Sequence, residues 1–285
     1  MHFLASLLLR ICAALPLGVL HAFGALLGWI MYFGSPAYRR HLRTNLAQAG
    51  FSDAATRCAA IAAAGKMLSE LPAIWLRPKD QVLGWVQRIE GEELLDQARA
   101  EGRGIVFLTP HHGCFEITAQ AAAARFPITV LYRAPRLRFL QPFVEQGRTG
   151  ANLKLAAADF GGVRELLGAL KRGETIGILP DQVPGQGEGV WADFFGRPAY
   201  TMTLAMRMAA RPNSATFLAF GERLPRAAGF VIHLRPLGSP LPGEAPERHL
   251  NRALESLVRE SPGQYLWAYN RYKLPRARGG ARMPA

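Results

Sequence analysis

The hydrophobic positions of this chain follow three successive patterns. Residues 3–33 are almost continuously apolar, and residues 44–77 carry apolar side chains three and four positions apart, a helical spacing that Pro72 and Pro78 should end. From residue 104 onward, short apolar runs alternate with helix-like segments. The patterns therefore predict an apolar N-terminal segment, a helical region and then alternating strands and helices.

The N-terminal segment is a candidate membrane anchor. Residues 11–33 form a stretch of 23 residues without a formally charged side chain, long enough to cross a hydrocarbon core as a helix. Pro16 and three glycines weaken that helix, so an oblique or interfacial orientation stays open, as does a buried core helix. A basic cluster, Arg39-Arg40-His41-Leu42-Arg43, follows at once. The positive-inside tendency places this end and the rest of the chain in the cytoplasm, unless the cluster is simply a solvated helix face.

The alternation predicts an α/β fold with a mixed, largely parallel sheet flanked by helices, behind an N-terminal membrane-anchoring helix. Strands are expected at 104–109, 128–132, 175–179, 215–220 and 230–237, with some antiparallel pairing near the C-terminus. Helices are expected at 91–100, 115–125, 139–146, 163–171, 201–210 and 247–260. We expect an anchor over residues 1–37, one domain over 38–275 and a basic, disordered tail over 276–285.

Composition narrows the functional classes. The 285 residues are 49% hydrophobic and 19% charged, which is typical of a packed globular protein and not of a disordered one. The net charge of +13 indicates an anionic partner, such as nucleic acid, an acidic membrane face or an acidic carrier. Only three cysteines occur, none in a C-x-x-C motif, which argues against a disulfide framework and a structural zinc site.

The strongest chemical signal lies after the strand predicted at 104–109. His111 and His112 follow that strand, and Glu116 falls in the first turn of the next helix. Open α/β sheets bind ligands at the carboxyl ends of their strands. A histidine held by a carboxylate works as a general base, because the carboxylate fixes the tautomer and stabilises the imidazolium.

Other interpretations of these residues remain open. Two histidines at this position could be purely structural, and His112 with Glu116 could share a helix face as metal ligands. Cys114 could be a nucleophile beside a histidine. The chain has no G-x-S-x-G elbow and no G-x-x-x-x-G-K-[ST] loop, which argues against an α/β serine hydrolase and a P-loop nucleotide-binding protein.

Four segments together resemble a known family. Residues 110–116, Pro-His-His-Gly-Cys-Phe-Glu, are similar to the H-x4-[DE] box of the glycerolipid-type acyltransferase superfamily. Three further segments are similar to motifs of the late acyltransferases of lipid A biosynthesis. They are the basic segment at 39–46, the segment Tyr132-Arg133-Ala134-Pro135, and Leu179-Pro180-Asp181-Gln182-Val183-Pro184-Gly185, which continues to Phe194-Phe195-Gly196-Arg197-Pro198-Ala199. The resemblance runs from about residue 3 to residue 272.

The resemblance implies roles for individual residues. His111 would be the general base and Glu116 its orienting partner. Arginines that bind phosphate or stabilise the oxyanion would be Arg133 and either Arg148 or Arg164, although Arg164 could simply belong to the polar face of its helix. Asp181 and Gln182 could shape the acceptor pocket, or merely cap the turn before Pro184.

The implied reaction moves a fatty acyl chain from acyl carrier protein or acyl-CoA to a hydroxyl of a lipid A precursor, an anionic glycolipid, at the cytoplasmic face of a bacterial inner membrane. It requires no metal or organic cofactor and no nucleic acid. Two alternatives remain: an acyltransferase acting on a lysophospholipid or a mannosylated phosphoinositide, and a non-catalytic basic module that binds membrane surfaces.

Overall fold

The chain folds around one mixed sheet. The computed structural model describes residues 2–135 and 138–275, so the tail predicted at 276–285 lies outside the described residues. Within them, seven strands form a sheet in the order β1 (Val86–Glu90), β9 (Phe230–Pro236), β8 (Ser214–Arg223), β2 (Gly104–Leu108), β5 (Thr175–Ile178), β3 (Ile128–Tyr132) and β4 (Leu153–Ala157). All neighbours are parallel except β8 and β9, which pair antiparallel. The predicted fold class is confirmed.

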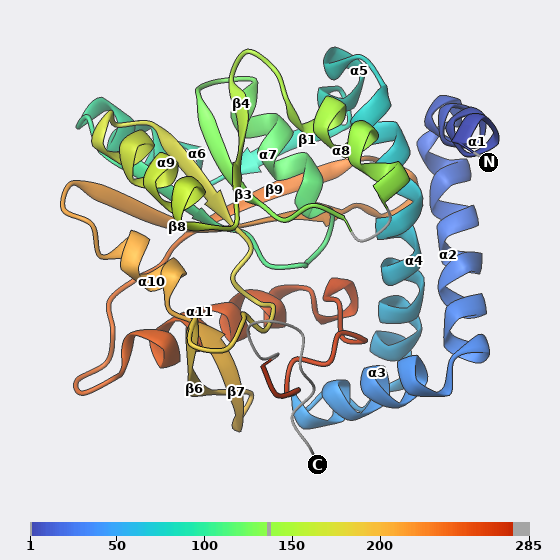
Figure 1. The fold of residues 1–285 in the computed structure, drawn as a ribbon. Coiled ribbons are helices and arrows are strands. Elements are labelled where there is room, and N and C mark those ends of the chain that lie inside the picture. Colours follow the sequence, from blue (N-terminus) through green and yellow to red (C-terminus); the bar gives the residue numbers. More distant parts are fainter. Residues whose placement is uncertain (1, 136–137, 276–285) are drawn as a thin grey trace.

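Helices cover both faces of the sheet (Figure 1). On one face, α6 (Glu92–Ala100) and α7 (Phe115–Ala123) bury apolar side chains against the strands. On the other lie α9 (Phe160–Lys171), α10 (Leu204–Ala209) and α11 (Pro246–Glu260). The strands of the central sheet are buried from both sides, which is why their sequences are continuous apolar runs rather than alternations.

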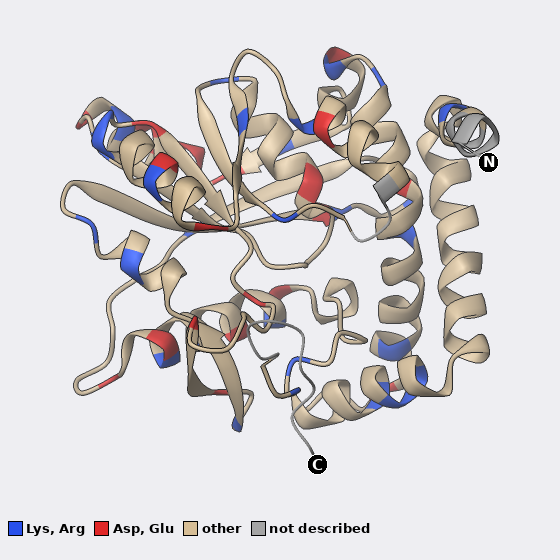
Figure 2. Ribbon diagram, in the orientation of Figure 1, with Lys and Arg blue, Asp and Glu red and all other residues tan. Residues whose placement is uncertain are grey.

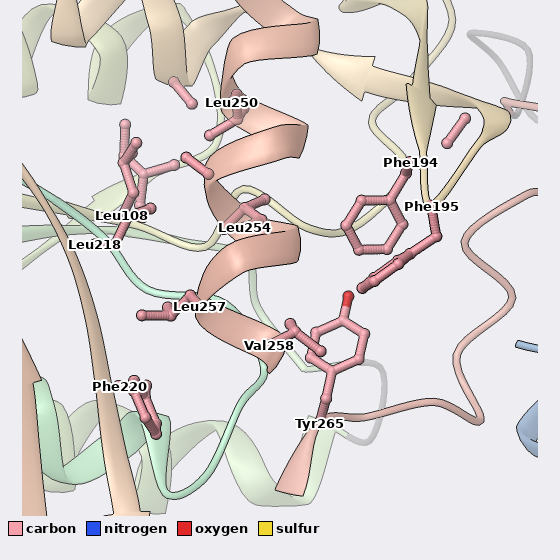
Figure 3. Close-up of a cluster of buried hydrophobic side chains, with 14 of the residues drawn as sticks. Leu108, Phe194, Phe195, Leu218, Phe220, Leu250, Leu254, Leu257, Val258 and Tyr265 are labelled. Atoms are coloured by element: carbon pink, nitrogen blue, oxygen red, sulfur yellow. The ribbon is translucent and has the colours of Figure 1, made fainter. Parts of the chain in front are cut away.

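The largest core cluster lies beneath α11 (Figure 3). Leu254 and Leu257 of this helix pack towards Leu108 and Leu218 of the central strands. An antiparallel hairpin outside the sheet, β6 (Gly189–Phe194) and β7 (Arg197–Met202), contributes Phe194 to the same cluster. The C-terminal third of the chain therefore closes one face of the sheet.

The N-terminal helices form a separate layer at one side of the sheet (Figure 1). They are α1 (His2–Ala14), α2 (Leu17–Gly34), α3 (Pro36–Gln48), α4 (Ala54–Leu76) and α5 (Lys79–Leu83), with α8 (Gln141–Arg148) packed on α4. Short 3-10 turns occupy Arg138–Leu140, Pro225–Ala227 and Pro262–Gln264. The helical region predicted at 44–77 is divided at Gly50, where φ is +87° and only glycine is unstrained, and Asp53 then caps α4. Pro72 lies inside α4, which continues to Leu76.

Two helices, α2 and α4, are long and apolar enough to cross a membrane by length and composition. They differ in their surroundings, because 67% of the apolar window of α4 is buried within the protein against 33% for α2. Burial identifies α4 as a core helix. The candidate for membrane attachment is therefore α2, within the segment predicted from the sequence.

Candidate active site

His111 lies in the loop between β2 and α7, at the carboxyl edge of the sheet. The loop is fixed by backbone hydrogen bonds, in which the Gly113 amide donates to the Gln264 carbonyl at 3.0 Å and the Cys114 amide donates to the Gly221 carbonyl at 2.7 Å. Gly113 has a φ of +58°, and a Cβ there would meet the Gly221 carbonyl oxygen. A glycine is thus required where the loop approaches β8, and this approach fixes the position of the loop that carries His111.

Asp181, from the end of β5, holds His111 in place. One carboxylate oxygen, Oδ2, accepts the His111 backbone N–H at 2.9 Å, and the other, Oδ1, lies 2.8 Å from ring Nδ1. Burial alone would raise the pKa of Asp181, but the attraction and hydrogen bonds of His111 outweigh it and hold the pKa below its usual value. A carboxylate can only accept, so the Nδ1 contact requires the proton on Nδ1 and leaves Nε2 as the basic nitrogen.

Gln182 completes the surroundings of the ring. Its side-chain Nε2 lies 3.1 Å from His111 Nε2. An amide N–H donates to a ring nitrogen that carries no proton, so this contact agrees with the tautomer that Asp181 selects. The Nε2 lone pair of His111 therefore carries no proton and accepts from Gln182, a contact that any other donor at Nε2 would have to replace.

Glu116 has different partners from those expected. It is buried in the first turn of α7, where its Oε2 accepts from Arg148 Nε at 2.9 Å and from Trp75 Nε1 at 3.3 Å, while its Oε1 accepts from Arg148 Nη2. Among the hydrogen bonds of the described residues, none joins Glu116 to His111. The expectation that Glu116 orients His111 is corrected here, because the carboxylate on the ring belongs to Asp181.

Arg148 is consequently part of a buried ion pair rather than a free cation. Burial lowers its pKa to about 10, so the guanidinium stays charged at neutral pH and forms two roughly parallel hydrogen bonds with Glu116. Its carbon Cζ also lies 5.9 Å from the centre of the Tyr132 ring. The pair sits in the wall of the cavity that contains His111.

That cavity has a volume of about 290 Å³, near the lower end of the range for small-molecule sites. His111, Gln182, Arg133 and Arg148 lie in its lining, together with the helix α7 residue Thr118. Apolar side chains make up most of the rest: Phe107, Ile128, Val130, Leu153, Leu155 and Ile178. One end of the cavity is polar and contains His111, and the remainder is lined mostly by hydrocarbon.

The apolar part of the cavity is a trough along one face of the sheet. Ile128 pairs with Leu153 and Val130 with Leu155 across β3 and β4, so alternate residues of both strands share this face. Gly177 of β5 is the neighbour of Val130 and adds no side chain to the floor. Along β3, from Tyr132 to Ile128, the trough follows about 13 Å of strand. Such a shape accommodates an extended apolar chain.

The two remaining predicted arginines lie in different places. Arg133 is exposed, lines the cavity and has no ion-pair partner among the described residues. Arg164 is exposed on α9 and lines a separate depression with Thr129 and Lys154. Those two strand residues alternate with Ile128 and Leu153, so Arg164 lies over the opposite face of the sheet. The structure does not bring Arg164 to the candidate site.

His112 and Cys114 have structural surroundings. His112 is fully buried, its ring stacks on Phe220 with centroids 4.3 Å apart, and Nε2 contacts the Ser261 carbonyl at 2.9 Å. Burial lowers the pKa of His112 to about 4 and raises that of the Cys114 thiol well above its usual value. A neutral, stacked histidine and a buried thiol are poor candidates for base and nucleophile. Within residues 2–135 and 138–275, no group of three or more His, Cys, Asp or Glu side chains could hold a metal ion.

Three residues of the site were not anticipated from the sequence. Trp75 comes from α4, far from the motif in sequence, and nothing in its local pattern indicates a contact with Glu116. Leu153 and Leu155 form the outer wall of the trough and belong to β4, a strand that was not predicted. Their alternation with Lys154 was a usable signal, since Lys154 faces the other side of the sheet.

Comparisons with known proteins find similarity to one enzyme family. The family model described as "Bacterial lipid A biosynthesis acyltransferase" matches residues 1–274. The chain is 25% identical over 212 residues to the lipid A biosynthesis palmitoleoyltransferase of Escherichia coli strain K12, covering 73% of this chain and 68% of that protein. It is 27% identical over 216 residues to the lipid A biosynthesis lauroyltransferase of the same strain, covering 73% of this chain and 69% of that protein. A lipid A biosynthesis acyltransferase of Haemophilus influenzae is 26% identical over 182 residues, covering 62% and 56%.

Proposed function

The chain belongs to the bacterial lipid A biosynthesis acyltransferase family, and we propose that it transfers a fatty acyl group from a thioester donor to a hydroxyl of a phosphorylated lipid A precursor. It is an acyltransferase, as its relatives are. We place the reaction at the cytoplasmic face of the bacterial inner membrane. The net charge of +13 favours an acidic acyl carrier protein as donor and an anionic glycolipid as acceptor.

One observation supports this function above all others. A histidine whose Nδ1 is held by a buried carboxylate stands at the polar end of an otherwise apolar trough. The trough suits the acyl chain, and the histidine suits the carbonyl at its end. An activated base beside a hydrocarbon site is the arrangement required to join a fatty acyl group to a hydroxyl.

The proposed chemistry needs one proton carrier. His111 Nε2 removes the proton from the acceptor hydroxyl while its oxygen attacks the thioester carbonyl, which forms a tetrahedral oxyanion. The C–S bond then breaks, the new ester remains on the acceptor, and the departing thiolate takes the proton back from the imidazolium. Asp181 stabilises the imidazolium throughout, since its Oδ1 is 2.8 Å from Nδ1. No covalent acyl-enzyme intermediate is formed.

We assign Glu116 to Arg148 rather than to His111. With its two hydrogen bonds, the carboxylate fixes the guanidinium in the cavity wall, where its positive charge lies near the developing oxyanion. Glu116 is thus a positioning residue. The exposed Arg133, which has no ion-pair partner among the described residues, supplies the cation for an acceptor phosphate.

The test is a transfer assay with purified full-length protein and two classes of acceptor. We expect acyl carrier thioester to be consumed with a phosphorylated disaccharide lipid, with one equivalent of thiol released for each ester formed. Equal or faster transfer to a lysophospholipid would contradict the assignment of the acceptor while retaining the acyltransferase chemistry. Absence of thioester consumption with any lipid acceptor would contradict the proposed function altogether.

A further inference from the structure

Helix α2 has two different faces along its whole length. Its outward residues Val19, Phe23, Leu26, Ile30 and Phe33 have exposed fractions between 47 and 67%, although all are large and apolar. They recur every three or four positions and so form one continuous stripe, and Ile11 of α1 is likewise exposed, at 52%. No Lys, Arg, Asp or Glu interrupts α2, which is uniformly tan in Figure 2.

The opposite face of α2 packs against α4 at very short range. A Cβ added at Gly24 would meet the backbone of Lys66, and one at Gly28 would meet the Ile61 carbonyl oxygen. Gly65 of α4 makes the reciprocal approach to Gly24 and Gly28. Small residues facing one another let two helix backbones come together without side chains between them. Figure 1 shows the two helices side by side.

Buried polar groups also join α2 to the domain. His21 Nε2 lies 2.7 Å from Glu70 Oε1 on α4, and Glu70 forms two hydrogen bonds with Arg223 at the end of β8, at 2.7 and 2.8 Å. The Ser69 hydroxyl donates to the Leu20 carbonyl at 2.8 Å. Removing α2 would leave part of this buried network unpaired, which is costly. The helix is therefore held by the same contacts that hold the interior of the protein.

Both ends of α2 are fixed by arginines of the domain. At the start, Arg77 donates from Nε and Nη2 to the Ala13 and Leu15 carbonyls at the α1–α2 junction. At the end, Arg39 Nη1 donates to the Tyr32 and Phe33 carbonyls, at 3.4 and 3.5 Å, which satisfies the last turn of the helix. Helix α2 is tied at its beginning, middle and end.

Helix α4 cannot leave the domain with α2. It packs on α8 and α7, and its Trp75 donates to Glu116 in the candidate active site. A perpendicular, membrane-crossing α2 would therefore draw α4 and the site itself into the bilayer. The contacts of α2 with α4 and with Arg39 and Arg77 cross the boundary expected at residue 37 between an anchor and a catalytic domain.

We propose that α2 does not cross the membrane but lies in the plane of one leaflet, with its outer stripe among the lipid acyl chains and the whole domain on one side. The occupant of this surface is the bilayer, because an apolar stripe is flanked by cations that suit anionic headgroups. Arg10 lies before the stripe, and Arg40 and Arg43 follow it on α3, all three exposed. Only the outer stripe of α2 is free to meet lipid, because its other side packs against α4 and is joined to it by the hydrogen bond between His21 and Glu70.

Depth measurements distinguish the two orientations. Full-length Val19→Cys, Leu26→Cys and Phe33→Cys variants, with Cys12 and Cys58 replaced by serine, would carry a fluorophore in vesicles of phosphatidylethanolamine and phosphatidylglycerol. Lipids brominated at different chain positions would then quench it. An in-plane helix places the three labels at nearly the same depth. A spanning helix places Val19 and Phe33 about 21 Å apart along the helix axis.

A depth difference above about 10 Å between those two labels, half the axial separation, would overturn the proposal. So would the absence of quenching from every lipid, which would mean that something else covers the stripe, such as a second copy of the chain. As an independent measurement, Leu26→Lys should weaken vesicle binding roughly tenfold or more. The matched control is Leu241→Lys, which alters an equally exposed leucine outside the stripe and should leave binding unchanged. Equal binding by both variants would also contradict the proposal.

Discussion

Replacement of Asp181 by asparagine tests how the base is prepared. Oδ2 of Asp181 accepts the His111 backbone N–H, so the oxygen of an asparagine must occupy that position. Its NH₂ group then faces ring Nδ1, and two donors cannot share one hydrogen bond. The ring proton moves to Nε2, and the nitrogen that should receive the acceptor's proton is already protonated.

The size of the effect follows from two contributions. Loss of a charged hydrogen bond to the imidazolium removes about 1.5–3 kcal/mol, or roughly 10- to 100-fold in rate. The wrong tautomer adds to this, and comparable replacements in catalytic triads reach about 10⁴-fold. We expect Asp181→Asn to lose about 10³–10⁴-fold in kcat with little change in KM, because Asp181 is only 3% exposed and out of reach of substrate. Although asparagine is nearly isosteric with aspartate, Asp181→Asn should be no more active than Asp181→Ala.

The assay is steady-state acyl transfer with donor and acceptor varied separately, and circular dichroism confirms the fold of each variant. Glu116→Gln is the informative comparison, because it weakens the hydrogen bonds to Arg148 without touching the His111 ring. Two results together would refute this role of Asp181. They are an Asp181→Asn enzyme that retains more than a tenth of the activity and a Glu116→Gln enzyme that loses about 10³-fold in kcat alone. Glu116 would then be the carboxylate that orients His111.

Three further predictions concern the cavity, the acceptor and stability. A methyl group at Gly177 would meet Val130 Cγ2 at 3.2 Å on the floor of the trough. The Gly177→Ala variant should therefore fold but accept shorter acyl chains. In assays with a series of donor chain lengths, kcat/KM for the longest accepted donor should fall by about fourfold for each methylene that no longer fits. Arg133→Lys should raise KM for a phosphorylated acceptor but not for a dephosphorylated one, whereas an equal effect on both would contradict phosphate binding. The folded pKa of His112 is about 4 against 6.5 in the unfolded chain, so acidification from pH 6.5 to 4 protonates the unfolded state first and removes about 3 kcal/mol of stability. In denaturant titrations, the free energy of unfolding of His112→Gln should fall by about 3 kcal/mol less than that of the unmodified protein between pH 6.5 and 4. The same pH dependence in both proteins would contradict the assignment of this loss of stability to His112.

The sequence predicted the central strands well because burial on both faces leaves a continuous apolar run. The runs at 104–108, 128–132 and 175–178 all became strands of the sheet. Strand β1 was missed because it lies at the edge, where Val86-Gln87-Arg88-Ile89-Glu90 is largely polar. The hairpin of β6 and β7 was missed because it pairs only with itself, outside the sheet. Strand β1 and the hairpin depend on tertiary packing that their local patterns do not record, whereas the edge strand β4 did carry an alternating pattern.

The partners of the candidate site residues in the structure differ from those expected from the sequence. His111 was expected at the carboxyl edge of the sheet and Asp181 in the acceptor pocket or the turn before Pro184, but only the pairing of β2 with β5 brings the two residues together. Glu116 was expected beside His111 because it follows five positions later. Its place in the first turn of α7 directs it towards Arg148 and Trp75 instead. Proximity in sequence does not identify the partner of a side chain, because that partner depends on strand order and helix face.

The step on which the proposed mechanism depends is removal of the acceptor hydroxyl's proton by His111 Nε2. Its most direct test compares His111→Gln with His112→Gln in single-turnover transfer from acyl carrier thioester to a phosphorylated disaccharide lipid, with the product detected by mass spectrometry. We predict that His111→Gln slows ester formation by about 10²–10⁴-fold, while His112→Gln, which alters a buried and stacked ring, stays within about tenfold of the unmodified enzyme. Ester formation that survives in His111→Gln and disappears in a folded His112→Gln would contradict the claim.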